Sequence, residues 1–132
     1  MFWTRLESWA TPGIPDLHGI LNGQAFWLEL KVHRLKSLKN IALRPHQIAW
    51  QTRYFMNKGK VYNLVHHPSS STLNIFGGGR AIKMGEAKVH EPLIPDWSCE
   101  SPFDWHGVID HILSSSDRHD KDDYDGEITT ER

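Results

Sequence analysis

The chain has 132 residues and a formal net charge of −1. Its length fits one domain with a core of its own and leaves little room for a second. A single cysteine excludes an intrachain disulfide framework and any zinc site built from cysteines. The first residues do not show a basic segment followed by an apolar one, as a leader would. No apolar run approaches the length of a membrane span. We therefore expect a soluble, cytoplasmic protein without membrane contacts.

Charge is distributed unevenly along the chain. Residues 1–62 carry a net charge of +6, residues 63–95 a net charge of +1, and residues 96–132 a net charge of −8. Contacts with phosphates need local positive charge rather than a high charge on the whole molecule. The basic first half is therefore the candidate for binding nucleic acid.

The N-terminal residues predict a strand and a turn. Residues 2–9 alternate between apolar and polar side chains, which is typical of a half-buried strand. The segment 11–13 contains proline and glycine and predicts a turn that ends this strand.

A hairpin is expected next. Asn22 and Gly23 separate two apolar runs, and such a pair favours a two-residue type I′ turn. The turn predicts paired strands over residues 16–21 and 24–32. It also fixes the register, because each pair of facing residues must be equally distant from the turn.

This register predicts two carboxylates that face each other. Asp16 is expected opposite Glu29, with Cβ atoms about 5 Å apart, and Lys31 shares the face of Glu29. Opposed like charges destabilise a sheet, and a divalent cation is the simplest reason to keep them. A lysine beside such a metal suits phosphodiester hydrolysis. The pattern therefore predicts a metal-dependent nuclease, and a solvated hairpin with an exposed ion pair is the alternative.

The apolar residues of the segment 33–44 follow no regular spacing. The segment therefore predicts a loop, close to these carboxylates. The loop contains four cations that are candidates for contacts with DNA phosphates: Arg34, Lys36, Lys39 and Arg44. The alternative is a basic stretch that is merely solvated.

A helix is expected over residues 45–57. Pro45 suits its first turn and Gly59 suits its end. Gln47 lies in the first turn, where its amide either supports an active site or is simply exposed.

The second half predicts further elements of the same sheet. Residues 60–66 should form a strand parallel to the second hairpin strand, because they return from a helix. Residues 72–76 predict another strand, and residues 77–79 a flexible glycine turn. Residues 80–98 are expected to be irregular, and residues 103–113 to form a final helix that covers the sheet.

The hairpin and the first helix resemble a known family. The pattern of Pro15-Asp16 followed by Glu29-Leu30-Lys31 is similar to the signature of the PD-(D/E)XK nuclease superfamily. A glutamine at the start of the next helix, Gln47, resembles that of the archaeal Holliday-junction resolvases and the VRR-NUC nucleases. The resemblance covers residues 3–66.

The resemblance implies a fold and a role for each residue. The fold would be α/β, with a mixed central sheet of the restriction-endonuclease type flanked by helices. Asp16, Glu29 and the carbonyl of Leu30 would bind Mg²⁺ or Mn²⁺, Lys31 would assist the water or stabilise the transition state, and Gln47 would support the site. The superfamily usually begins with a helix that carries another glutamate. This chain begins with a strand instead, and Glu7 either replaces that glutamate or is a surface residue.

We therefore expect a nuclease domain over residues 1–113 and a disordered acidic tail over residues 114–132. The function expected is hydrolysis of DNA, structure-selective on branched DNA, by a homodimer that supplies two sites. The alternatives are a sequence-reading homing or restriction-like endonuclease and a non-catalytic DNA-binding protein on the same fold. The small size suggests a phage origin, and hence the cytoplasm of an infected host cell.

Overall fold

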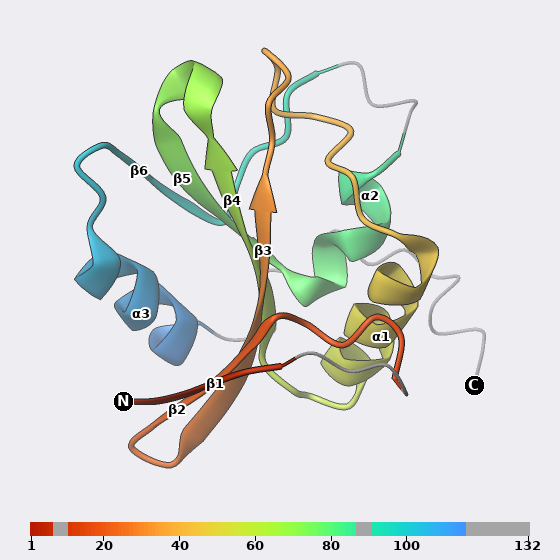
Figure 1. The fold of residues 1–132 in the computed structure, drawn as a ribbon, viewed down its shortest axis with the longest axis vertical. Coiled ribbons are helices and arrows are strands. Elements are labelled where there is room, and N and C mark those ends of the chain that lie inside the picture. Colours follow the sequence, from red (N-terminus) through yellow and green to blue (C-terminus); the bar gives the residue numbers. More distant parts are fainter. Residues whose placement is uncertain (7–10, 87–90, 116–132) are drawn as a thin grey trace.

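The computed structural model describes residues 1–6, 11–86 and 91–115. Its centre is one six-stranded sheet in which the strands follow one another in sequence order, β1-β2-β3-β4-β5-β6 (Figure 1). Three helices pack on the two faces of this sheet. The expected α/β class, with a mixed central sheet flanked by helices, is confirmed.

The first three strands form an antiparallel meander: β1 (Phe2–Arg5), β2 (Leu17–Leu21) and β3 (Gln24–Val32). The predicted hairpin register is confirmed from the Leu21–Gln24 pair to the Leu17–Leu28 pair. Both residues of the Asn22-Gly23 turn have positive φ, as a type I′ turn requires. β1 ends at Arg5, before the predicted end of the first strand, and residues 7–10 lie outside the described part of the chain.

A helix connects the hairpin to the second half of the sheet. α1 (Pro45–Met56) follows the loop that was expected over residues 33–44. The chain then enters β4 (Val61–His67), which pairs with β3 in parallel. The predicted helix, the strand after it and the parallel pairing are all confirmed.

The region after β4 differs in part from expectation. β5 (Thr72–Gly77) follows a 3₁₀ turn, η1 (Pro68–Ser70), and agrees with the predicted strand. The glycines expected to form a flexible turn are instead buried, in the last residue of β5 and in η2 (Gly78–Arg80). A Cβ on Gly78 would lie 2.3 Å from Val61, and one on Gly79 would lie 2.9 Å from the Phe55 ring. These glycines therefore allow close packing.

The prediction that residues 80–98 are irregular is wrong at both ends. η2 continues into the short helix α2 (Ala81–Met84), whose Met84 is buried. The sheet then gains an edge strand, β6 (Trp97–Glu100), antiparallel to β5. A strand of only four residues gives little sequence signal, and the pairing with β5 defines it.

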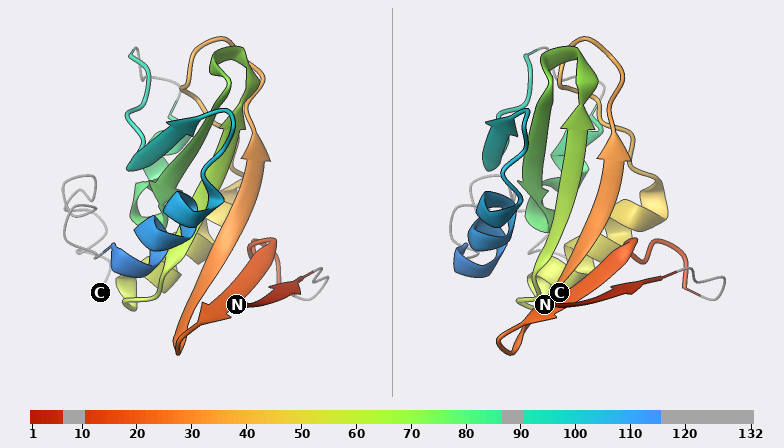
Figure 2. Two further views of the ribbon diagram at one scale, coloured as in Figure 1. Left: turned by 90° about the vertical axis from the view of Figure 1, so that its left-hand side faces the viewer. Right: turned by 60° about the vertical axis from the view of Figure 1, so that its left-hand side comes forward.

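The two faces of the sheet carry separate cores (Figure 2). One face packs against α3 (Trp105–Ser114) through Val108 and Ile112, which contact Phe26 and Leu28 of β3. The other face lies under α1 and α2. Along β3 the side chains alternate between these faces, so Trp27, Glu29 and Lys31 lie on the α1 side. The fold thus directs the charged residues of β3 toward the beginning of α1.

The division into a domain over residues 1–113 and a disordered tail over residues 114–132 stays a prediction. Ser114 is the last residue of α3, and Ser115 accepts a hydrogen bond from Lys60 Nζ at 2.8 Å through its carbonyl oxygen. The rest of the predicted tail, residues 116–132, lies outside the described part. Among the described residues, no helix is long and apolar enough to cross a membrane.

Candidate active site

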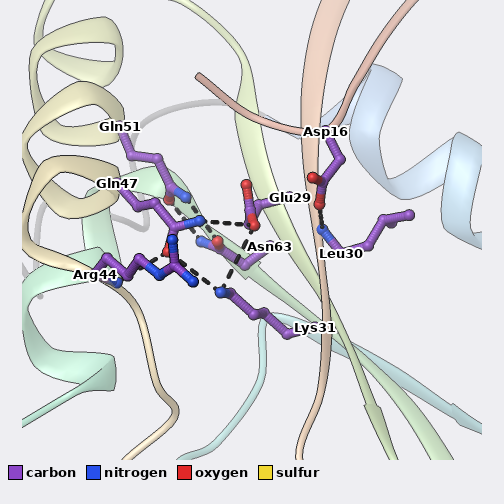
Figure 3. A network of polar contacts seen from close by, with 8 residues as sticks. All are labelled: Asp16, Glu29, Leu30, Lys31, Arg44, Gln47, Gln51 and Asn63. Atoms are coloured by element: carbon purple, nitrogen blue, oxygen red, sulfur yellow. Dashed lines mark hydrogen bonds and ion pairs between the residues drawn. The ribbon is translucent and has the colours of Figure 1, made fainter. Parts of the chain in front are cut away.

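Four predicted site residues converge where β2, β3 and α1 meet (Figure 3). Asp16 directly precedes β2, so it lies one residue beyond the last pair of the hairpin ladder. Glu29 and Lys31 come from β3, and Gln47 comes from the first turn of α1. Because these elements are far apart in sequence, the site depends on the folded sheet.

Asp16 is held in place by the backbone. Its Oδ2 accepts a hydrogen bond from the Leu30 amide at 2.9 Å, and its carbonyl oxygen accepts one from the Leu6 amide at 2.9 Å. Leu30 itself turns its side chain to the opposite face, where it is 44% exposed. The predicted role of the Leu30 carbonyl as a metal ligand stays a prediction.

Glu29 is the most perturbed group of the site. Its side chain is buried, and burial is the main reason that its pKa is raised from 4.5 to about 7. The neighbouring Asp16 carboxylate raises this pKa further, whereas the Lys31 ammonium, 3.7 Å away, opposes the shift. Glu29 Oε1 is buried and has no hydrogen-bond partner among the described residues. A negatively charged oxygen in this position calls for a cation.

Gln47 links the helix to both charged residues of β3. Its Nε2 donates to Glu29 Oε2 at 3.0 Å, and its Oε1 accepts from Lys31 Nζ at 3.2 Å. The same Oε1 accepts from the backbone amide of Arg44 at 2.9 Å, one residue before the helix begins. A single side chain therefore fixes the positions of a carboxylate, an ammonium and a helix end.

A pair of amide side chains lies beneath these residues. The sequence did not predict this pair. Gln51 and Asn63 are fully buried and exchange two hydrogen bonds of 2.8 and 2.7 Å. Asn63 is the β4 partner of Glu29 in the parallel register, and Gln51 lies one turn after Gln47. One signal was available, because Asn63 is the only polar side chain in the apolar run 61–65.

The residues present fit a divalent cation. Asp16 and Glu29 offer carboxylate oxygens, one of which is buried and not hydrogen-bonded to any described residue. Mg²⁺ commonly uses one or two protein carboxylates and keeps waters or substrate phosphates in its other positions. Within residues 1–6, 11–86 and 91–115, however, no group of three or more His, Cys, Asp or Glu side chains could hold a metal. Glu7, the possible additional acid, lies outside these ranges.

The predicted DNA-binding cations lie along the loop between β3 and α1. Arg34, Lys36 and Arg44 are exposed, and Lys39 is half-buried. The loop is anchored by buried histidines: His33 hydrogen-bonds through its ring to the Ser37 carbonyl at 2.7 Å, and His67 reaches the Leu35 carbonyl at 2.9 Å. The cations thus project from a tethered segment that starts two residues after Lys31.

Comparison with solved structures finds several matching chains, among them an archaeal nuclease. A crystal structure of Hjc, a Holliday junction resolvase from the archaeal hyperthermophile Archaeoglobus fulgidus, superposes with a TM-score of 0.45 and 13% sequence identity. The match covers 76% of this chain and 74% of Hjc. No protein-family model and no curated protein matches the sequence. At this TM-score and identity, nothing about the activity of this chain follows from the likeness.

Proposed function

We propose that this protein is a metal-dependent endonuclease that hydrolyses DNA phosphodiester bonds. One observation carries the proposal: Asp16 and Glu29 converge beside Lys31, and a buried oxygen of Glu29 finds no partner in the part of the chain that the structure describes. This arrangement is unfavourable without a cation, because burial and the neighbouring carboxylate both oppose the charge on Glu29. With Mg²⁺ or Mn²⁺ bound, it becomes a suitable site for a phosphate.

The residues of the site would divide the chemistry between them. Asp16, Glu29 and the Leu30 carbonyl would hold the cation. When bound, the metal would supply Lewis acidity toward the scissile phosphate and lower the pKa of a water. Lys31, positioned by Gln47, would orient the attacking water or donate to a phosphate oxygen in which charge develops. Gln47 would keep Glu29 and Lys31 at a fixed separation.

DNA recognition would rest on phosphates and on the shape of the duplex. Arg34, Lys36, Lys39 and Arg44 lie on the segment that begins beside Lys31 and ends at α1. Contacts of this kind position a duplex without reading its bases. We therefore propose selectivity for branched DNA over linear duplex.

Assembly follows from the number of sites. Cutting two strands at a junction calls for two metal sites at a fixed separation, which a homodimer with a two-fold axis supplies. We expect a homodimer by light scattering at micromolar concentration. A monomer under these conditions would contradict the paired-cut model.

A metal titration tests the proposal directly. Purified protein is incubated with supercoiled plasmid, a four-way junction and a matched linear duplex in EDTA, Mg²⁺ or Mn²⁺. We expect cleavage only with the divalent ion and faster on the junction, with near-symmetric nicks. Equal rates on junction and linear duplex, with fixed cut sites, would favour the sequence-reading alternative.

One observation favours the alternative of a DNA-binding protein without catalytic activity. In the described part of the chain the site has two carboxylates rather than a group of three metal-ligating side chains. A protein that binds DNA with the same affinity in EDTA and in Mg²⁺, and never cuts it, would be a DNA-binding protein on this fold.

A further inference from the structure

A groove runs along α1 on the outer side of the molecule, next to the candidate active site. One wall is formed by Thr11 and Pro12, and the other by α1 residues about one helical turn apart, among them His46, Trp50 and Arg53. The volume is about 670 Å³, which falls in the range of sites for small molecules. The proposed hydrolysis uses none of these residues.

Both walls of the groove neighbour residues of the site along the chain. The segment 11–12 leads through Gly13 to Asp16, and His46 directly precedes Gln47. The two walls touch at Gly13, where a Cβ would lie only 2.2 Å from the His46 carbonyl oxygen. A DNA strand in the site would therefore have the groove beside it.

An aromatic cluster connects the groove to β3. Trp50 and Tyr54 both line the groove and stack on each other, with ring centroids 4.8 Å apart and an interplanar angle of 12°. Trp27 packs edge-on against Trp50 at 5.3 Å. Trp27 also lies on the same face of β3 as Glu29, two residues away, or roughly 7 Å along the strand.

The polar groups of the groove favour an anionic ligand. Arg53 and His46 are exposed, and none of the described residues that line the groove carries a carboxylate. Arg53 takes part in neither of the two ion pairs formed within the described ranges, Lys31–Glu29 and Arg80–Asp96. Asn57, at the end of the groove, adds an amide that can pair with a base edge. Aromatic rings, an amide and a cation are groups that recognise a nucleotide.

We propose that this groove binds an unpaired nucleotide of the DNA substrate, with its base against the Trp50–Tyr54 stack and its phosphate near Arg53. The inference rests on the proposed nuclease function and specifies its substrate. A base inside an intact duplex is stacked between its neighbours and cannot enter the groove. The preferred substrate is therefore DNA with a single-stranded segment beside the cut, such as a flap or a gap.

Binding measurements without cleavage test this inference. The full chain is titrated in EDTA with a fluorescent blunt duplex and with the same duplex carrying a single-stranded tail. We expect tighter binding of the tailed DNA. Trp50→Leu should weaken that binding roughly ten-fold, as expected for loss of one stacked base, and change blunt-duplex binding less than two-fold. Trp105→Leu is the matched control, because Trp105 is exposed on the α3 side.

Two further variants keep the test valid if Trp50→Leu fails to fold. Ala49 is exposed and lines the groove, so Ala49→Glu adds a carboxylate there without removing any packing. It should reduce tailed-DNA affinity about as strongly as Trp50→Leu. Arg53→Gln should reduce the salt dependence of that binding by about one phosphate contact. A 2-aminopurine in the tail should be quenched by the wild type and not by Ala49→Glu.

The outcomes separate this inference from the nuclease proposal. Cleavage by the wild type, with equal affinity for blunt and tailed DNA and no effect of Ala49→Glu, would overturn the groove assignment only. Tail-selective binding that Ala49→Glu removes, without cleavage in any metal, would overturn the nuclease proposal and leave the groove assignment supported. No measurable binding of tailed DNA would also overturn the groove assignment.

Discussion

Glu29 gives the clearest prediction for a single residue. Its pKa is about 7 in the folded protein, against an ordinary value of 4.5. Between these values the folded state holds a proton that the unfolded chain has lost, so the free energy of unfolding falls as pH rises. Glu29→Gln removes this dependence. We expect it to stabilise the metal-free protein at pH 8 by about 1–3 kcal/mol and to have little effect at pH 4.

Urea unfolding in EDTA at the two pH values measures this effect. The matched control is Glu100→Gln, since Glu100 is an exposed glutamate on edge strand β6. A loss of stability at pH 8 would mean that Glu29 is stabilised by its ion pair with Lys31 more than it is destabilised by burial.

The other charged residues of the site are expected to affect catalysis rather than folding. Asp16→Asn removes metal charge and Lys31→Ala removes the ammonium, and neither creates a cavity in either core. Each should reduce single-turnover cleavage at least a hundred-fold and leave the circular dichroism spectrum unchanged. Cleavage at the wild-type rate by either variant would contradict the assignment of the site.

The Gln51–Asn63 pair carries a prediction for two elements, α1 and β4. Asn63→Ala leaves the buried Gln51 amide without its two partners. We expect a loss of about 2–4 kcal/mol in unfolding free energy. The double variant Gln51→Leu/Asn63→Leu should lose less, because it leaves no unsatisfied polar group. Chemical denaturation of this double variant and of the single variants Gln51→Leu and Asn63→Leu gives the coupling energy, and additive losses would contradict a direct pair.

The elements differ in how well the sequence predicts them, and the reason is where their defining contacts come from. The hairpin was predictable because its turn, alternation and register lie within one short segment. β6 and the buried glycines at 77–79 depend on partners elsewhere in the chain, such as Ile75 for β6 and Phe55 for Gly79. The order of apolar and polar residues within one segment does not show which distant residues pack against it.

The same distinction applies to the site. The hairpin register and the family resemblance predicted that four residues belong to one site: Asp16, Glu29, Lys31 and Gln47. The buried Gln51–Asn63 layer was not foreseen, because it forms only when the crossover places α1 over β4. The pKa of Glu29 was equally inaccessible, since its main cause is burial.

At the scale of the whole molecule, the boundary of the acidic tail can be tested. Residues 116–132 include most of the acidic charge of the C-terminal third, which would compete with DNA for the basic loop. Truncation after Ser115 should preserve folding and tighten non-specific DNA binding at low salt. Truncation after residue 111 removes Ile112 and Ser115, whose carbonyls accept from Lys60 Nζ, and should lower thermal stability.

Thermal unfolding and DNA binding of the two truncated chains check these expectations. Unfolding of the chain that ends at Ser115 would mean that the tail contributes to the fold. Unchanged non-specific binding at low salt would mean that its charge does not reach the DNA-binding surface.

The close contact at Gly13 has a consequence for the whole protein. Gly13 has a φ of 87°, and its α-carbon touches the backbone of α1 at His46. The segment that leads to Asp16 therefore packs directly against the helix that carries Gln47, with no side chain between them. Neither residue can shift far without moving the other, so the distance between the two halves of the site is set by main-chain contact. We therefore expect the two halves of the site to be in place before any ligand arrives, so that binding a metal or DNA need not organise them.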